Sequence, residues 1–199
     1  MTLSVVHDET GTATHYVGVL SNITQLLKRQ QQLEQVANHD FLTGLPNRLF
    51  LFVRLGQAMA QATRNRDFLA VCYLDLDGFK TINDAFGHAA GDLLLQEIAM
   101  RSQTIVRGND TVARMGGDEF AILLGDLKHP DDCTNLLERL LKAIQCPVAL
   151  PSGQTVTVTA SIGATLFPDD NGLPDALLQH ADSAMYQAKD SGKAQYKFY

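Results

Sequence analysis

The amino-acid sequence predicts an α+β fold, in which helices flank a mainly antiparallel central sheet. Stretches with the two-residue repeat of strands alternate with stretches of helical periodicity along most of the 199 residues. Two pairs of strand-like stretches are joined by short glycine-containing turns, Gly116-Gly117 and Pro151-Ser152-Gly153, which suit antiparallel neighbours. Hydrophobic residues make up 45% of the chain, enough for one core and an appendage. Helices packed on such strands form an α+β sandwich.

The first 39 residues are expected to form the appendage. Residues 3–6 and 15–20 are typical of two strands of a hairpin, which is marginal without a partner surface and suggests the remnant of a neighbouring domain. Spacings of three and four then predict a short coiled-coil seam, made of Ile23, Leu26, Gln30, Leu33 and Ala37. The alternative is one amphipathic helix docked on its own domain, since Gln30 interrupts the stripe.

Turn signals and periodicity place the remaining elements in order. Gly44 and Pro46 break the chain before a helix that Asn47 can cap. We expect helices at residues 48–63, 79–86 and 130–144, one from after residues 87–91 to about 106, and one that ends at Gly192. We expect strands at residues 69–76, 111–115, 118–124, 156–166 and 195–198. The helical side chains expected to face the core are Leu49, Leu51, Phe52, Leu55, Ala58 or Met59, Leu94, Leu95, Ile98, Ile105, Leu177, Ala181, Met185 and Ala188.

Composition excludes several classes of function. The formal net charge of −6 argues against non-specific nucleic-acid binding, which needs a basic face. The three cysteines, Cys72, Cys133 and Cys146, are widely spaced, so we expect no disulfide and a reducing compartment. No apolar run approaches the ~20 residues of a membrane span. We therefore expect a cytoplasmic segment without membrane contact, although a longer parent protein could be membrane-anchored.

Acidic side chains gather at the ends of two predicted strands. Asp118 and Glu119 follow the Gly-Gly turn, which taken alone favours a solvated surface hairpin. Upstream, the buried-looking run of residues 69–76 delivers Asp75 and Asp77 to one face by alternation. Two strand ends that offer carboxylates are what a divalent-metal site for phosphoryl transfer requires.

Two separated strings carry a family resemblance. They are Asp75-Leu-Asp-Gly-Phe-Lys-Thr-Ile-Asn-Asp-Ala-Phe-Gly-His-Ala-Ala-Gly-Asp92 and Arg114-Met-Gly-Gly-Asp-Glu-Phe120. The chain from about Asp40 to Tyr199 resembles the GGDEF family of diguanylate cyclases, which implies the ferredoxin-like palm of nucleotidyl cyclases. Residues 40–199 are then the GGDEF domain, residues 25–39 a signalling linker helix, and residues 1–24 resemble the end of a PAS sensor domain.

The resemblance implies an activity with its cofactor and partners. Two GTP would be condensed into cyclic di-GMP and two pyrophosphates, with Mg²⁺ or Mn²⁺, where two GGDEF domains of a homodimer face each other. It further implies a catalytic role for Asp118, Glu119 and Lys80. Asp75, the Leu76 carbonyl, Asp118 and Glu119 would hold the metal, with the metal role of Asp118 safer than its role as proton acceptor.

Substrate contacts follow from the same resemblance. Asn83 and Asp92 match the guanine readers, and His88 falls at a third substrate position, where a loop-packing or capping histidine is an equal alternative. Lys80, Lys189 and Lys193 are the phosphate cations. From spacing alone, Lys189 and Lys193 would only complement a helix dipole. The family usually has Arg at the last position, so Lys193 keeps the charge but loses the bidentate fork.

Arg107 and Asp110 form an Arg-x-x-Asp at the position of the family's product-inhibition site. As a bare tetrapeptide this pattern is most often a solvated ion pair. Physically, Arg107 can bind a phosphate or guanine through two parallel hydrogen bonds, and Asp110 can accept from a guanine edge.

Three functions other than a diguanylate cyclase agree less well with the sequence. The end of the chain, Gln195-Tyr-Lys-Phe-Tyr199, resembles the junction to an EAL phosphodiesterase domain, and a catalytically silent module that binds GTP or cyclic di-GMP is the main alternative. An EF-hand fails, because Phe79, Lys80 and Phe86 stand where a ligand, the turn glycine and the final acid belong. A template-directed polymerase palm is disfavoured by the acidic charge balance.

Overall fold

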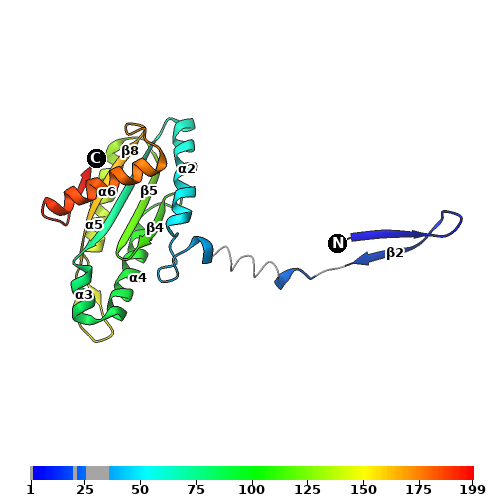
Figure 1. The fold of residues 1–199 in the computed structure, drawn as a ribbon, viewed down its shortest axis with the longest axis horizontal. Coiled ribbons are helices and arrows are strands. Elements are labelled where there is room, and N and C mark those ends of the chain that lie inside the picture. The colour runs from blue at the N-terminus through cyan, green and yellow to red at the C-terminus, as the bar shows by residue number, and fades with distance from the viewer. Residues whose placement is uncertain (1, 20–21, 26–35) are drawn as a thin grey trace. The chain divides into compact units, whose positions relative to one another are not determined.

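The computed structural model describes residues 2–19, 22–25 and 36–199 (Figure 1). The chain divides into two compact units, Met1–Ala37 and Asn38–Tyr199. In the first unit, β1 (Thr2–His7) and β2 (Ala13–Val19) form the predicted antiparallel hairpin. The Asp8 carboxylate closes it by accepting from the amides of Thr10 and Thr12. Most of the predicted coiled-coil seam, Leu26, Gln30 and Leu33, lies outside the described residues.

The second unit is built on one five-stranded sheet with the order β4-β5-β3-β8-β9. Its strands are β3 (Phe68–Asp77), β4 (Thr111–Gly116), β5 (Glu119–Leu127), β8 (Thr159–Phe167) and β9 (Tyr196–Phe198). Only the β8–β9 pairing is parallel among these neighbours. The mainly antiparallel sheet of the predicted α+β class is therefore confirmed.

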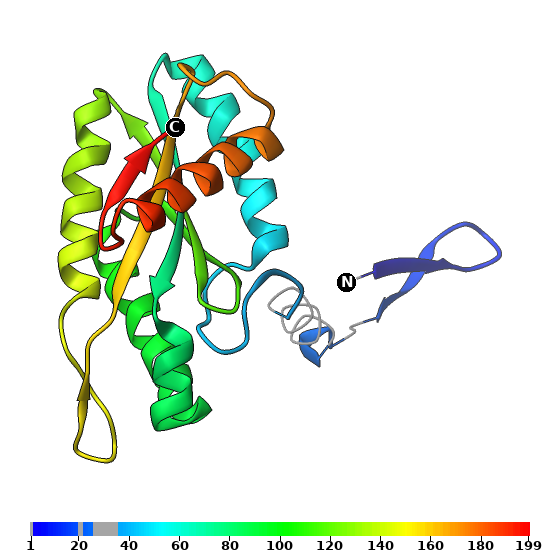
Figure 2. The same cartoon turned by 60° about the vertical axis from the view of Figure 1, so that its left-hand side comes forward.

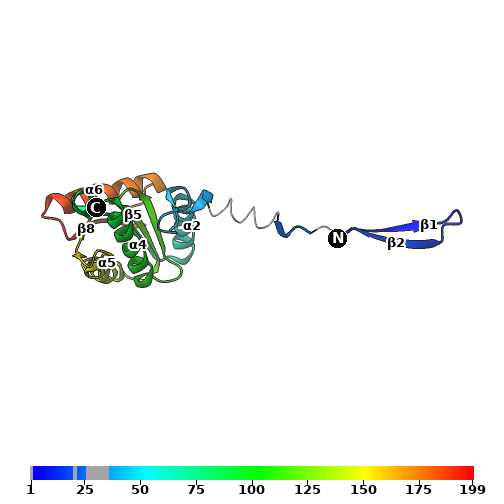
Figure 3. The same ribbon diagram turned by 90° about the horizontal axis from the view of Figure 1, so that it is seen from below.

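Helices cover both faces of this sheet (Figure 3). They are α2 (Arg48–Asn65), α3 (Phe79–Phe86), α4 (His88–Ile105), α5 (Pro130–Ile144) and α6 (Pro174–Asp190). Alternation along β3 sends Cys72 and Leu74 into the core under α4 and α5, and Leu69 and Val71 into the core under α2 and α6. The sheet is thus the middle of three layers, which buries β3 on both faces (Figure 2).

Helix α6 approaches the sheet unusually closely at one glycine. A Cβ on Gly163 of β8 would lie 1.9 Å from the carbonyl oxygen of Ala181 and 2.1 Å from the amide nitrogen of Met185. The predicted stripe of Leu177, Ala181 and Met185 on α6 is fully buried there. Small residues at the contact let the backbone of α6 rest on the strand.

Several expected boundaries and orientations were wrong. Gly116 pairs with Glu119, so the hairpin turn is Gly117-Asp118 and not Gly116-Gly117. The helix expected after residues 87–91 already begins at His88. Leu49 is 64% exposed, because it lies on the outer side of α2, whereas Leu51 and Leu55 are buried as expected.

The strand expected at residues 156–166 is divided into two. β7 (Thr155–Val156) pairs with β6 (Val148–Ala149) in a small separate sheet, and the chain then enters β8 at Thr159. The expected hairpin through Pro151 is present, but it is this small one. In the parts of the chain that the structure describes, no helix combines the length and apolar character needed to cross a bilayer.

Candidate active site

The predicted acids meet at one end of the two central strands. Asp75 of β3 lies directly across from Glu119 of β5 in the antiparallel register. The Leu76 amide donates to the main-chain carbonyl of Asp118 at 3.4 Å, which brings the turn residue alongside β3. Asp75, Asp118 and Glu119 are all half-buried. The sequence therefore folds so that three carboxylates from two separate motifs lie together at one end of the sheet.

The turn that carries Asp118 is held by one arginine. Gly117 adopts a φ of 53°, in the left-handed region that favours glycine. The guanidinium of Arg114 donates to the Gly117 carbonyl at 3.0 and 2.7 Å and to both oxygens of Asp40 at 3.0 and 3.1 Å. This pairing contributes to a lowered pKa of Asp40, where hydrogen bonds from Thr43 and Arg114 outweigh burial. The turn is thus fixed to the loop at residues 38–47.

Lys189 supplies the cation of the site. Its Nζ lies 2.8 Å from Oδ2 of Asp75, and both side chains are mostly shielded from solvent. Burial raises the pKa of Asp75, and the charge of Asp118 raises it further. The hydrogen bond with Lys189 acts to lower this pKa, but the net shift is upward. Burial acts to lower the pKa of Lys189, but the hydrogen bond and charge of Asp75 outweigh it, so the net shift is upward. One ammonium therefore leaves the carboxylates with surplus negative charge.

Tyr73 and Asp182 complete the acidic cluster. The hydroxyl of Tyr73 donates to Oε2 of Glu119 at 3.0 Å. Burial and then the charge of Glu119 raise the pKa of the Tyr73 phenol, so the hydroxyl keeps its proton. Burial, followed by the charge of Glu119, likewise raises the pKa of Asp182 on α6. Glu119 consequently lies between a hydrogen-bond donor and another carboxylate.

A scan against family models decides which family this arrangement belongs to. The model described as "Diguanylate cyclase, GGDEF domain" matches residues 37–195. The chain belongs to the GGDEF family. The expected family is thereby confirmed, and the match covers most of the second unit and none of the N-terminal hairpin.

Named relatives extend this GGDEF assignment. The bifunctional diguanylate cyclase/cyclic di-GMP phosphodiesterase MucR of Pseudomonas aeruginosa is 47% identical over 176 residues, which are 88% of this chain and 25% of MucR. Diguanylate cyclase TpbB of the same species is 45% identical over 165 residues, or 83% of this chain and 38% of TpbB. The chain thus spans well under half the length of either relative.

Solved GGDEF domains share the fold. The GGDEF domain of TpbB from P. aeruginosa has a TM-score of 0.78 at 44% identity, covering 80% of this chain and 93% of that one. The GGDEF domain of DgcB from Caulobacter crescentus, solved in complex with c-di-GMP, has a TM-score of 0.76 at 25% identity, covering 81% and 93%.

Asn83, a predicted guanine reader of the GGDEF domain, has a side-chain oxygen that accepts no hydrogen bond from the described residues. Its Oδ1 is buried and has no hydrogen-bond partner among the described residues. A Cβ on Gly91 would lie 1.9 Å from that oxygen, so the missing side chain of Gly91 makes the room that Asn83 occupies between α3 and α4. The other predicted reader, Asp92, and His88 at the third substrate position are exposed in the first turns of α4. A buried acceptor without a donor is costly, which fits a position that a ligand completes.

The remaining predicted cations form no salt bridge with the acids in the described residues. Lys80 on α3 and Lys193 after α6 are both exposed, and neither side chain has an ion-pair partner in the described part of the chain. Lys193 adopts a φ of 63°, and its amide donates to the Ala188 carbonyl at 3.1 Å to close the end of α6. Of the three lysines predicted to bind phosphate, Lys189 alone forms a salt bridge with an acid of the cluster in the described residues.

The Arg-x-x-Asp sequence forms a turn instead of an ion pair. The Asp110 carboxylate accepts from the amides of Arg107 at 2.8 Å and Gly125 at 3.1 Å. Burial raises the pKa of Asp110 despite these bonds. The side chain of Arg107 is exposed, and no salt bridge joins it to Asp110 in the described residues. Asp110 therefore fixes the turn, and Arg107 is left available.

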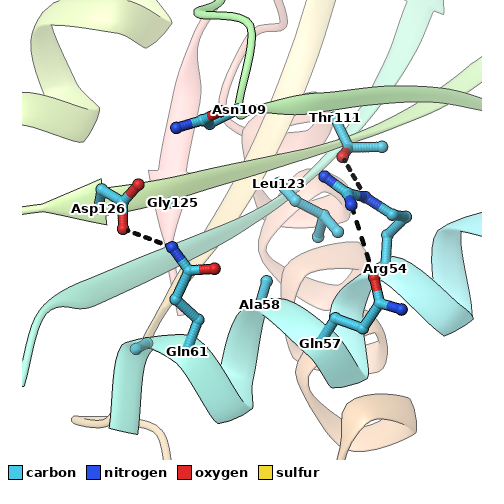
Figure 4. Close-up of a pocket in the computed structure, with 10 residues that line it drawn as sticks. Arg54, Gln57, Ala58, Gln61, Asn109, Thr111, Leu123, Gly125 and Asp126 are labelled. Atoms are coloured by element: carbon cyan, nitrogen blue, oxygen red, sulfur yellow. Dashed lines mark hydrogen bonds between the residues drawn. The ribbon is translucent and has the colours of Figure 1, made fainter. Parts of the chain in front are cut away.

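A hollow of about 270 Å³ opens beside this turn, at the opposite end of the β4–β5 hairpin from Asp118 (Figure 4). Two pairs of its polar side chains bond each other, since Arg54 donates to Thr111 at 3.4 Å and Gln61 to Asp126 at 3.0 Å. None of the acids of the cluster lines this hollow, so it is separate from the candidate active site.

Sequence reasoning missed Tyr73, Asp182 and the true role of Asp77. Tyr73 shares a face with Asp75 by alternation, and Asp182 stands seven residues, two helical turns, before Lys189. Both signals were available in the sequence. Asp77 accepts from the hydroxyls of Thr159 and Ser161 at 2.7 and 2.8 Å and from the Ala194 amide at 3.2 Å. It therefore ties β8 and the segment after α6 to β3, which is a structural role.

The donor set suits a hard divalent cation bound together with a nucleotide. Among the described residues, no three His, Cys, Asp or Glu side chains are arranged to hold a metal ion by themselves. Mg²⁺ usually takes only one or two carboxylates and completes its shell with water and substrate phosphates. Asp75, Asp118 and the Leu76 carbonyl fit that requirement, and their surplus negative charge favours a cation.

Proposed function

We propose that residues 40–199 are a diguanylate cyclase that condenses two GTP into cyclic di-GMP and two pyrophosphates. The observation that carries the proposal is the convergence of Asp75, Asp118 and Lys189 at the end of the central strands. Membership of the GGDEF family and the name of TpbB support it. The N-terminal residues 1–24 are proposed to be the end of a PAS-like domain and residues 25–39 a linker helix.

Each residue of the site has a proposed task. Asp75, the Leu76 carbonyl and Asp118 would hold Mg²⁺ or Mn²⁺, with Glu119 beside them. When bound, the metal would neutralise the triphosphate and polarise the α-phosphate. Lys80, Lys189 and Lys193 bind the phosphate oxygens, and Asp118 is the candidate acceptor of the 3′-hydroxyl proton. Asn83 and Asp92 accept from the N1 and N2 groups of guanine, with His88 beside them.

The reaction requires two domains. One domain binds one GTP, so the 3′-hydroxyl of each nucleotide attacks the α-phosphate of the other, and two new phosphodiester bonds form as two pyrophosphates leave. A homodimer holds the two nucleotides at the right distance and orientation, which makes the encounter effectively unimolecular. We further propose that cyclic di-GMP inhibits through the exposed Arg107 beside Asp110.

The deciding experiment is incubation of the chain with GTP and Mg²⁺, followed by chromatographic separation of the nucleotides. We expect cyclic di-GMP, a specific activity that rises with protein concentration, and no product from Asp118→Ala. The main alternative is a silent module that binds GTP or cyclic di-GMP beside a phosphodiesterase, a pairing that the bifunctional name of MucR makes worth testing. GTP that is bound but not converted would support the module and contradict the cyclase.

Gly91→Ala is expected to weaken GTP binding about tenfold or more, the effect of losing one good hydrogen bond. The new Cβ would displace Asn83 from the space it occupies, since the Cβ site lies 1.9 Å from Oδ1 and 3.1 Å from Cζ of Phe79. Overpacking should also cost about 1–3 kcal/mol of stability. Calorimetry with 3′-deoxy-GTP, which cannot cyclise, measures the affinity. In Gly108→Ala the Cβ meets nothing within 4 Å, so this control should bind normally.

Lys189→Met is expected to have opposite effects on two ligands. GTP should bind less tightly, because a phosphate cation is lost. Mn²⁺ without nucleotide should bind about fivefold more tightly, because Asp75 loses the ammonium that lies 2.8 Å away; the factor is small since solvent reaches the pair. Titration of the free Mn²⁺ signal by electron paramagnetic resonance measures this. Lys193→Met, which removes an unpaired lysine, should leave Mn²⁺ binding unchanged. Weaker Mn²⁺ binding by Lys189→Met would contradict this account of the ion pair.

A further inference from the structure

Among the described residues, Tyr73 is the tyrosine whose hydroxyl donates a hydrogen bond to an acid of the site. It lies on β3 two residues before Asp75, so both side chains project from the same face of the sheet. Its hydroxyl reaches diagonally across to β5 and donates to Oε2 of Glu119 at 3.0 Å. Since an ionised carboxylate only accepts, the phenol is the donor in this contact.

The surroundings give Glu119 few other ways to be satisfied. Its neighbours on β3 and α6 are Asp75, directly opposite in register, and Asp182, whose pKa its charge helps to raise. Neither ionised side chain can donate a hydrogen bond to it. Tyr73 and Asp182 also line a hollow of about 410 Å³ together with Arg48, but no hydrogen bond or salt bridge joins Arg48 to Glu119 in the described residues. Among the described residues, the Tyr73 hydroxyl is therefore the hydrogen-bond donor that holds this half-buried carboxylate.

We propose that Tyr73 is a positioning residue, whose hydroxyl holds one oxygen of Glu119 so that the other is presented to the cation beside Asp75 and Asp118. The inference rests on the proposed function, because it assumes that a divalent cation binds at these acids. Side chains that orient metal ligands typically change metal affinity or activity by about 10–100-fold when removed. Tyr73 would thus set how tightly the site holds its cation without touching substrate.

The test compares Tyr73→Phe with the wild-type chain. Mn²⁺ binding is measured by electron paramagnetic resonance, without nucleotide and with 3′-deoxy-GTP, alongside the thermal midpoint of unfolding. We expect the dissociation constant for Mn²⁺ to rise about tenfold or more. The Mg²⁺ concentration for half-maximal activity should rise by a similar factor, whereas KM for GTP at saturating Mg²⁺ should not change.

Two controls separate positioning from packing. Tyr196→Phe removes a hydroxyl that makes no hydrogen bond in the described residues, on the distant strand β9, and should leave Mn²⁺ binding unchanged. In a Glu119→Gln background, Tyr73→Phe should have little further effect on Mn²⁺ binding, because the carboxylate it acts through is gone.

Outcomes of this test stay distinct from those of the cyclase assay. A folded Tyr73→Phe that binds Mn²⁺ as wild type does overturns the inference, even if its thermal midpoint falls. A wild-type chain that binds no Mn²⁺ under either condition overturns it as well. A chain that binds Mn²⁺ through Tyr73 yet makes no cyclic di-GMP supports the inference and contradicts only the proposed activity.

Discussion

Replacing Asp75 with asparagine is expected to lower the rate of cyclic di-GMP formation by about 10³-fold or more while the domain stays folded. The amide keeps the size of the carboxylate but removes the charge at the place where β3 meets the Asp118 turn. Initial rates at saturating GTP and Mg²⁺ measure the effect. A variant that keeps a tenth of the wild-type rate would show that Asp75 is not a principal cation ligand.

The pKa of Asp75 makes this variant informative about stability as well. Because the folded pKa is raised above that of the unfolded chain, the folded state binds more protons between the two values, and stability rises as the pH falls through that window. At neutral pH the ionised carboxylate therefore costs stability. Asp75→Asn should unfold at the same temperature as wild type or higher. Asp131→Asn, on the exposed first turn of α5, is the control that should keep full activity.

Gly163→Ala is expected to have the largest effect on stability, at least about 3 kcal/mol. Its Cβ would lie 1.9 Å from one backbone atom of α6 and 2.1 Å from another, and backbone atoms cannot rotate away as a side chain can. For a chain of this size, that loss corresponds to a fall of roughly 6–12 °C in the thermal midpoint. Calorimetry or circular dichroism would record it, and an unchanged midpoint would mean that α6 does not rest on β8 at this position.

Gly56→Ala is the matched control with the opposite expected sign. Gly56 lies within α2, and a Cβ there meets nothing within 4 Å. Alanine in an exposed helix interior should stabilise by about 0.5–1 kcal/mol. If both variants lost stability equally, the clash at Gly163 would not be the reason for its effect.

Much of the fold could be predicted because its signals are local. The helix at Pro130–Ile144 has proline at its start and a regular apolar stripe, and the structure gives those bounds. The strand before Asp75 and the stripe of α6 follow in the same way from periodicity. Leu49 was misplaced because its apolar character alone does not reveal that it lies outside the buried stripe of Leu51 and Leu55.

The parts of the site that were missed depend on contacts between distant residues. The Gly-Gly turn was misplaced by one residue because the register of Gly116 with Glu119 is set by the neighbouring strands. Asp75 and Asp77 alternate identically in the sequence, yet only the partners of Asp77 on β8 reveal that it is structural. The hydrogen bond of Tyr73 could likewise not be predicted, because it depends on the pairing of β3 with β5, which places Glu119 near the Tyr73 hydroxyl.

Arg114, which lies 74 residues after Asp40, joins the Asp40 loop to the turn of Gly117. If the loop moved alone, the half-buried carboxylate of Asp40 and the guanidinium would be separated, and a shielded charge without its partner is costly. A shift of the Asp40 loop therefore either breaks its pairing with Arg114 or is shared by the Gly117 turn, which Arg114 also holds. One side chain thus couples the position of the loop at the start of the domain to the position of the turn that carries Asp118.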